Sequence, residues 1–135
     1  MRTVVADASA IVEYLLRTSA AGRIGIIIED ATTDVHVPAL CDVEVAASIR
    51  RALLQRRITV ERAEEAVADY LDLPLLRHGH ERLIAQILRR RANFTAYDAT
   101  YVTLAEELSA DLLSADRPLL RAVARHTRVR SAIGR

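Results

Sequence analysis

Lysine and tryptophan are absent from this 135-residue chain, which contains only one cysteine, one phenylalanine, four glycines and three prolines. Because all 19 basic residues are arginine, reactions that need a lysine are excluded, including Schiff-base catalysis and a phosphate-binding GxxxxGK[ST] loop. The single cysteine, Cys41, excludes an intramolecular disulfide and a thiolate metal cage. A hydrophobic content of 51% excludes intrinsic disorder, and an aromatic content of 4% predicts an aliphatic core.

The size and charge of the chain predict one domain that spans residues 1–135. A formal net charge of +1 gives no bulk preference for nucleic acid. The longest apolar cluster, residues 24–28, is too short to span a bilayer, and Asp7 and Glu13 interrupt the apolar run that a signal peptide needs. We therefore expect a cytoplasmic protein that makes no membrane contact.

Short apolar segments alternate with helical patterns along the chain. Strands are predicted at residues 3–6, 34–38, 73–76, 112–114 and 127–130. Helices are predicted after Ser9, over 20–29, 39–57, 60–72, 80–92 and 96–108, and from Arg117 onward, with Ser9, Thr59, Thr95 and Asp116 as N-caps. This alternation favours an α/β domain with a central parallel sheet of about five short strands, covered by helices on both faces.

Four carboxylates occupy positions that simple solvation of a helix face does not explain. Asp7 and Asp116 follow the first and fourth predicted strands, at the sheet edge where open α/β folds bind ligands. Asp98 lies on the apolar stripe of its helix, and a carboxylate that faces inward is costly unless it is compensated. Glu44 lies near the start of its helix beside small residues. Two strand ends and two helix starts meet at one rim of a parallel sheet, so we expect these carboxylates to converge.

Negative charges that converge at one rim repel each other unless a proton or a bound cation relieves them. Ligands that are all oxygen favour Mg²⁺ or Mn²⁺ over Zn²⁺. Histidine offers no competing site, because His78 and His80 fall in an expected loop and His36 and His126 are isolated in the sequence. The sequence has no HExxH pair and no GxSxG elbow, so it does not support a zinc protease or a serine hydrolase.

Four segments, in order and at family-like spacing, resemble the PIN-domain ribonucleases and more narrowly the VapC toxins of bacterial toxin–antitoxin pairs. They are VADASA at 5–10, VEVA at 43–46, TAYDATY at 95–101 and LSADR at 113–117. The resemblance spans nearly the whole chain and implies a PIN-like three-layer α/β/α fold and a Mg²⁺- or Mn²⁺-dependent endoribonuclease. It also implies a set of site residues: catalytic Asp7, Glu44, Asp98 and Asp116, of which Asp7, Asp98 and Asp116 are metal ligands, with Ser9 and Ser114 supporting them.

The same resemblance implies an RNA substrate, a small VapB-like antitoxin as partner, and a homodimer. Arginines at 50–51 and 89–91 are candidates for contacts with the RNA backbone. Two alternatives stay open, a housekeeping PIN nuclease without an antitoxin and a non-catalytic PIN-like module that binds RNA or protein. A phosphatase with an aspartyl nucleophile is disfavoured, because it needs a second acid two residues after Asp7 and that position is Ser9.

Overall fold

The computed structural model describes residues 1–134 and contains a four-stranded parallel sheet in the order β3–β2–β1–β4. The strands are β1 (Arg2–Ala6), β2 (Thr33–Pro38), β3 (Leu76–His78) and β4 (Asp111–Leu113). In place of a fifth strand at 127–130, one parallel bridge joins Ser131 to Leu112 of β4. The predicted parallel sheet is therefore confirmed, with four strands and one bridge.

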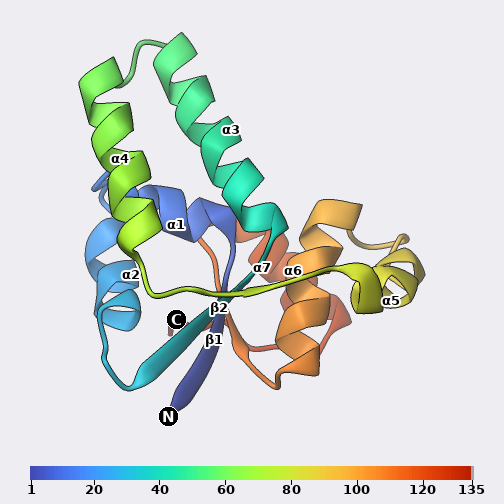
Figure 1. The fold of residues 1–135 in the computed structure, drawn as a ribbon. Coiled ribbons are helices and arrows are strands. Elements are labelled where there is room, and N and C mark those ends of the chain that lie inside the picture. The colour runs from blue at the N-terminus through green and yellow to red at the C-terminus, as the bar shows by residue number, and fades with distance from the viewer. Residues whose placement is uncertain (135) are drawn as a thin grey trace.

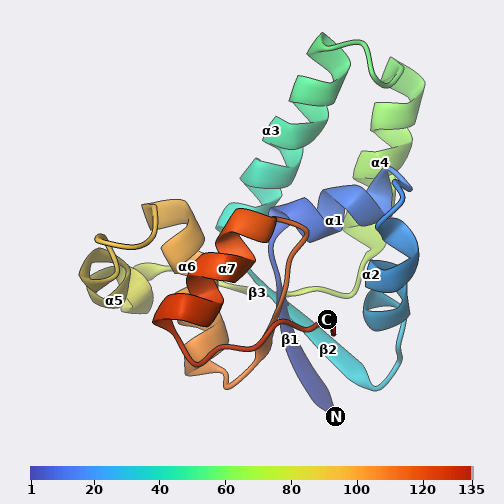
Figure 2. The ribbon, with the colours of Figure 1, turned by 180° about the vertical axis from the view of Figure 1, so that it is seen from behind.

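Helices cover both faces of this sheet. They are α1 (Ala8–Leu15), α2 (Ala21–Ile28), α3 (Leu40–Leu54), α4 (Val60–Asp72), α5 (Ile84–Arg89), α6 (Ala96–Glu107) and α7 (Arg117–His126), with a 3₁₀ turn at Glu81–Leu83. Helices α1 and α2 lie on one side of the sheet and α6 and α7 on the other, while the α3–α4 hairpin projects beyond the sheet (Figures 1 and 2). This arrangement confirms the three-layer α/β/α prediction.

Side-chain caps determine where several helices begin. Thr59, Thr95 and Asp116 each accept a hydrogen bond from the backbone N–H three residues later, as predicted. The prediction that Ser9 caps the first helix is wrong, because α1 already begins at Ala8 and Asp7 is its N-cap. Asp7 therefore lies directly between β1 and α1, and its side chain caps the helix.

The edge strand β3 differs from the predicted one. The predicted strand at 73–76 overlaps the observed one only at Leu76, which pairs with His36. Pairing with β2, and not local hydrophobicity, decides which residues form this strand. Leu73 and Leu75 pack against the core as part of the connection. The interpretation of His36 as isolated is also wrong, since its Nδ1 lies 2.8 Å from Nε2 of His78 across this strand pair.

The core is aliphatic, as the composition predicts. Its largest fully buried side chains are Ile11, Ile24, Leu83, Leu104, Leu112, Leu113, Val4, Val5, Val37, Val102, Val123 and Pro38. Because β1 is buried on both faces, its apolar run is continuous rather than alternating. Among residues 1–134, no helix is both long enough and apolar enough to cross a membrane.

Candidate functional site

The carboxyl ends of β1 and β4 lie side by side and feed helices on opposite faces of the sheet (Figure 2). Parallel sheets open a crevice at such a point, where the chain connections diverge. Asp7 follows β1 directly, and Ser114 and Asp116 follow β4. We call this rim, where β1 and β4 end, the crevice; from both strands it carries residues that the sequence singles out.

Asp7 is held in place by hydrogen bonds to both of its carboxylate oxygens. Oδ1 accepts from the Ser9 hydroxyl at 2.6 Å and from the Ala10 backbone N–H at 3.0 Å, and Oδ2 accepts from the Ser114 hydroxyl at 2.6 Å. The Ser9 hydroxyl in turn accepts from the Ala115 backbone N–H at 3.0 Å, and the two serine oxygens lie 3.3 Å apart. These contacts fix the carboxylate and tie the end of β1 to the end of β4.

The aspartates of the crevice share one electrostatic environment. Burial raises the pKa of Asp7 to about 6, against the lowering effect of its three hydrogen bonds, and the charge of Asp116 adds to the rise. Burial also raises the pKa of Asp98, and here again the charge of Asp116 contributes. Asp116 therefore lies within electrostatic reach of both other aspartates. A proton or a cation at this rim would relieve the unfavourable charge of Asp7 and Asp98.

Glu44 reaches the site through a tyrosine. Its Oε1 accepts a hydrogen bond from the Tyr101 hydroxyl at 2.5 Å, which joins α3 to α6 one turn after Asp98. Burial first, and then the neighbouring Cys41 and Glu44, raise the pKa of Tyr101, so its hydroxyl stays a donor. The sequence analysis gave Tyr101 no role in the site. The available signal was that a buried tyrosine hydroxyl usually needs a partner.

The carboxylate oxygens of Asp7, Asp98 and Asp116 are ligands that a hard divalent cation prefers, but they do not surround a single point. In the described part of the chain, no three His, Cys, Asp or Glu side chains gather closely enough to hold a metal ion. Asp7 and Asp116 are both fixed as N-caps, each with Oδ1 bonded to a backbone N–H. Asp98 caps no helix and is half-buried, and a hydrogen bond with the Thr95 side chain lowers its pKa against the rise from burial.

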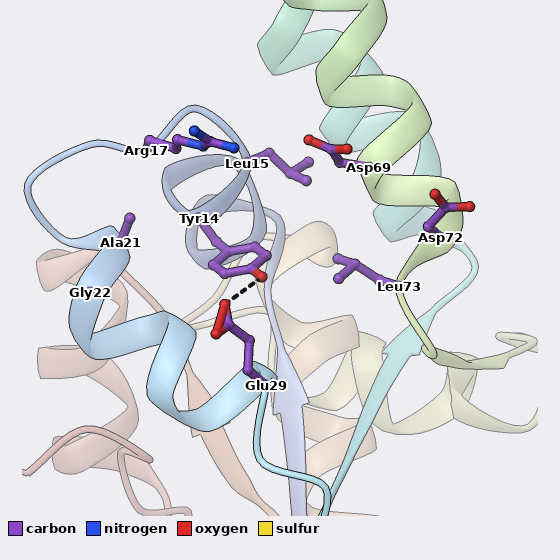
Figure 3. A pocket seen from close by; sticks show the side chains of 9 residues that line it. All are labelled: Tyr14, Leu15, Arg17, Ala21, Gly22, Glu29, Asp69, Asp72 and Leu73. Atoms are coloured by element: carbon purple, nitrogen blue, oxygen red, sulfur yellow. Dashed lines mark hydrogen bonds between the residues drawn. The ribbon is translucent and has the colours of Figure 1, made fainter.

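Two pockets in the described part of the chain lie away from these carboxylates. A pocket of about 580 Å³ lies where α1, α2 and α4 meet, and the Tyr14 hydroxyl on its wall donates to Glu29 at 2.8 Å (Figure 3). Neither this pocket nor a second one of about 420 Å³ includes any of the four predicted acids. We assign the site by its charge and hydrogen bonding, because a rim that binds the backbone of a polymer does not need a deep hollow.

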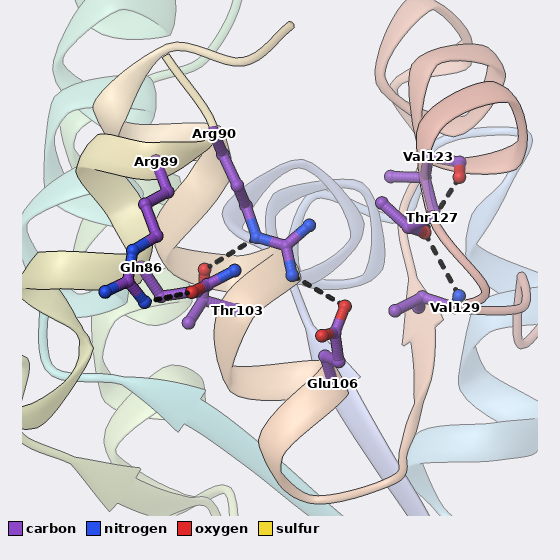
Figure 4. Close-up of polar contacts among 8 residues, drawn as sticks. All are labelled: Gln86, Arg89, Arg90, Thr103, Glu106, Val123, Thr127 and Val129. Carbon is purple, nitrogen blue, oxygen red and sulfur yellow. Dashed lines mark hydrogen bonds and ion pairs between the residues drawn. The ribbon is translucent and has the colours of Figure 1, made fainter. Parts of the chain in front are cut away.

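The arginines predicted to contact RNA do not share one environment. The Arg90 side chain is largely buried and donates hydrogen bonds to Thr103 at 3.1 Å and to Glu106 at 2.6 Å (Figure 4). Its side chain is only 10% exposed. Arg89 and Arg91 are exposed at the end of α5, as are Arg50 and Arg51 on α3. Arg90 is therefore a structural residue of the α5–α6 contact.

Comparison with known proteins decides the family. The family model described as PIN domain matches residues 4–125. The chain belongs to the PIN domain family. Ribonuclease VapC3 of Mycobacterium tuberculosis strain H37Rv is 38% identical over 122 residues, which cover 88% of this chain and 86% of that protein. Ribonuclease VapC12 of the same strain is 34% identical over 113 residues, which cover 84% of this chain and 86% of its own. These relatives place this PIN domain in the VapC group.

Solved structures show the same fold at low sequence identity. A protein of Pyrobaculum aerophilum, PAE2754, superposes with a TM-score of 0.69 at 19% identity, covering 96% of this chain and 83% of that one. Mycobacterium tuberculosis VapC20, described as a Sarcin-Ricin loop cleaving toxin, gives a TM-score of 0.67 at 16% identity and covers 94% of this chain and 98% of its own. The PIN fold of this chain is thus established independently of its sequence relatives.

Proposed function

We propose that this PIN domain is a Mg²⁺- or Mn²⁺-dependent endoribonuclease and the toxin of a VapBC-type toxin–antitoxin pair. The observation that carries the proposal is the group of three aspartates at the crevice, where burial and the charge of Asp116 raise the pKa of Asp7 and of Asp98. Within residues 1–134, none of these three aspartates forms an ion pair with an arginine. The naming of its relatives as VapC ribonucleases supports RNA as the substrate.

Asp7, Asp98 and Asp116 are the residues that would hold the cation. When bound there, a divalent cation supplies an activated water and neutralises charge on the phosphate. The hydroxyls of Ser9 and Ser114 orient the Asp7 carboxylate, so its position is set before substrate arrives.

Glu44 would supply a fourth carboxylate from α3, the helix that follows β2. Its Oε1 is occupied by the Tyr101 hydroxyl, which leaves Oε2 as the oxygen available to hold water or substrate. Because Tyr101 and Asp98 lie three residues apart on α6, movement of this helix would shift both carboxylates together.

Cleavage by paired aspartate variants tests this assignment. Asp98→Asn keeps the side-chain volume, removes one cation ligand and is expected to abolish cleavage of cellular RNA by the purified protein. The matched control is Asp111→Asn, because Asp111 starts β4 and pairs with Arg2 at 3.2 Å on the exposed surface. Loss of cleavage in Asp98→Asn, together with full activity in the Asp111→Asn control, supports the proposal. Equal loss in both variants, or full activity of Asp98→Asn, overturns it.

The toxin role requires a partner that restrains the nuclease in the cytoplasm. A basic side chain of a small VapB-like antitoxin would pair with the aspartates of the crevice and exclude the cation. Expression of this chain alone is expected to arrest growth, and co-expression with the neighbouring small gene is expected to relieve the arrest and yield a stable complex. Normal growth on expression alone, with no binding by the neighbouring product, would leave a housekeeping nuclease as the better account.

A homodimer is part of the same proposal. Helix α4 exposes Val60, Val67 and Leu71, whose exposed fractions are 58%, 43% and 69%. Of the isoleucine cluster at 24–28, only Ile26 is exposed, because Ile24, Ile27 and Ile28 pack in the core. An apolar face of this kind fits a contact between two copies related by a two-fold axis.

A further inference from the structure

Charge is unevenly distributed along this chain. All 18 acidic residues lie at or before Asp116, whereas six of the 19 arginines follow it. Residues 117–134, which comprise α7 and the segment after it, therefore contain no carboxylate side chain at all. A balanced net charge conceals this basic C-terminal segment, which begins at the acidic crevice.

Helix α7 arranges part of this charge in a line. Arg117, Arg121 and Arg125 recur every four residues and are all exposed, while Leu119 and Val123 turn the other face of the helix into the core. At ~1.5 Å of rise per residue, successive arginines lie about 6 Å apart along the helix axis, and the three span about 12 Å. We call Arg117, Arg121 and Arg125 the arginine stripe.

The arginine stripe carries uncompensated charge. Within residues 1–134, the ion pairs involve Arg2, Arg62, Arg77, Arg82 and Arg90, and none involves the arginine stripe. By contrast, Arg90 pairs with Glu106 at 2.6 Å (Figure 4). Arg82 likewise pairs with Glu107 at 2.7 Å. Arginines that serve solvation or helix packing commonly pair with carboxylates, whereas unpaired ones in a row are suited to phosphates.

We propose that the arginine stripe binds the phosphate backbone of RNA next to the cleavage site. The proposal rests on the proposed nuclease function and adds the direction in which the substrate leaves the crevice. Asp116 is the N-cap of α7, so the stripe starts at the residue after a predicted cation ligand. The carboxylates of the crevice repel a polyanion, and a bound cation offsets that repulsion only locally. A positive surface that starts at the rim supplies the remaining attraction and sets the register of the strand.

RNA is favoured over an acidic protein as the occupant because the stripe is continuous with the crevice. Guanidinium groups at regular intervals match a strand that carries one phosphate per nucleotide. Such contacts carry no sequence information, so the arginine stripe contributes affinity and orientation to every RNA substrate alike.

Binding in EDTA tests this proposal separately from catalysis. The triple variant Arg117→Gln/Arg121→Gln/Arg125→Gln is compared with the control Arg17→Gln/Arg56→Gln/Arg57→Gln, which removes the same charge from the exposed turns after α1 and α3. Glutamine and arginine have similar helix propensities and all six side chains are exposed, so both variants are expected to fold, which circular dichroism checks. The measurement is the fluorescence anisotropy of a labelled single-stranded RNA over a series of salt concentrations.

Each lost phosphate contact lowers the slope of log K against log salt by about 0.7 for a single strand, so the stripe variant is expected to lose about 2. The control variant is expected to keep the wild-type slope. Equal slopes in the two triple variants overturn the proposal. So does unchanged RNA binding by the stripe variant together with a weaker antitoxin complex, which would make the stripe a protein contact.

If the triple variant fails to fold, Arg121→Gln alone decides the question, with an expected loss of about 0.7 in slope. Because binding is measured in EDTA, where no cleavage is expected, a wild type that fails to cleave RNA when Mg²⁺ is supplied would overturn the nuclease function without deciding this binding result.

Discussion

Replacing Asp7 by asparagine is expected to stabilise the cation-free protein while it abolishes nuclease activity. Burial raises the pKa of Asp7 from 3.8 to about 6, so at neutral pH the folded protein holds an ionised carboxylate in an unfavourable place. At ~1.4 kcal/mol per pKa unit, this difference corresponds to about 3 kcal/mol. Asparagine removes the charge and keeps an acceptor oxygen for the N-cap bond to Ala10.

The stability gained by Asp7→Asn is expected to disappear at low pH. The raised pKa of Asp7 means that the folded state binds its proton below about pH 6, whereas the unfolded state binds it only below 3.8. Stability contributed by that proton is therefore complete below pH 3.8 and is lost as pH rises toward 6. The advantage of Asp7→Asn is expected to be about 3 kcal/mol at pH 7 and to vanish below pH 4.

Urea unfolding in EDTA, from pH 4 to pH 8, measures this advantage. A gain of about 3 kcal/mol at pH 7 corresponds to a rise in melting temperature on the order of 10 °C. Asp111→Asn is the control, because its partly exposed partner Arg2 makes a contribution that is small at any pH. An Asp7→Asn variant that is less stable than wild type at pH 7, or whose advantage is equal at pH 4 and pH 7, would refute the reasoning.

Four further outcomes are expected. Asp98→Asn, whose wild-type pKa is raised by burial and by Asp116, is expected to melt no lower than wild type without cation; a clear fall in melting temperature would make Asp98 structural. Tyr101→Phe removes the hydrogen bond to Glu44 and is expected to cost about 1–3 kcal/mol in urea unfolding and to reduce cleavage, and no change in either would exclude Glu44 from the site. Burial and the charges of His36 and Arg82 lower the pKa of His78, so the folded state takes up this proton at a lower pH than the unfolded state does. Stability is therefore expected to fall as pH drops below 6.5, and His78→Gln is expected to make that fall smaller. Leu71→Asp on the exposed face of α4 is expected to convert a dimer into a monomer by light scattering, and a wild-type monomer at micromolar concentration would refute the dimer.

Local signals predicted those parts of the fold in which neighbouring residues decide the structure. The helix at 60–72 begins after Thr59 as predicted, because its capping bond joins residues that are three positions apart. Helix α5 is shorter than the predicted 80–92, because residues 81–83 form a 3₁₀ turn and the helix stops at Arg89. The edge strand moved from 73–76 to Leu76–His78, since only β2 can show which residues it pairs with.

In the candidate site too, features set by neighbouring residues were predicted, and features set by residues distant in the sequence were not. Asp7 and Asp116 were found from strand ends, and Asp98 from a carboxylate on an apolar stripe, because all three positions can be read from a short window. The positions of Ser9 and Ser114 beside the site were implied only by family resemblance, and their bonds to Asp7 were not predicted. The Tyr101–Glu44 bond was not predicted either. It joins residues 57 positions apart, so its geometry depends on how α3 packs against α6.

Removal and return of the cation test the central claim most directly. Purified wild-type protein, free of contaminating nuclease, is incubated with RNA in EDTA, and Mg²⁺ or Mn²⁺ is then added in excess over the chelator. The account predicts no cleavage in EDTA and recovery after either ion, with Asp98→Asn inactive throughout. Cleavage that continues undiminished in EDTA would contradict a cation held by Asp7, Asp98 and Asp116, and with it the proposed mechanism.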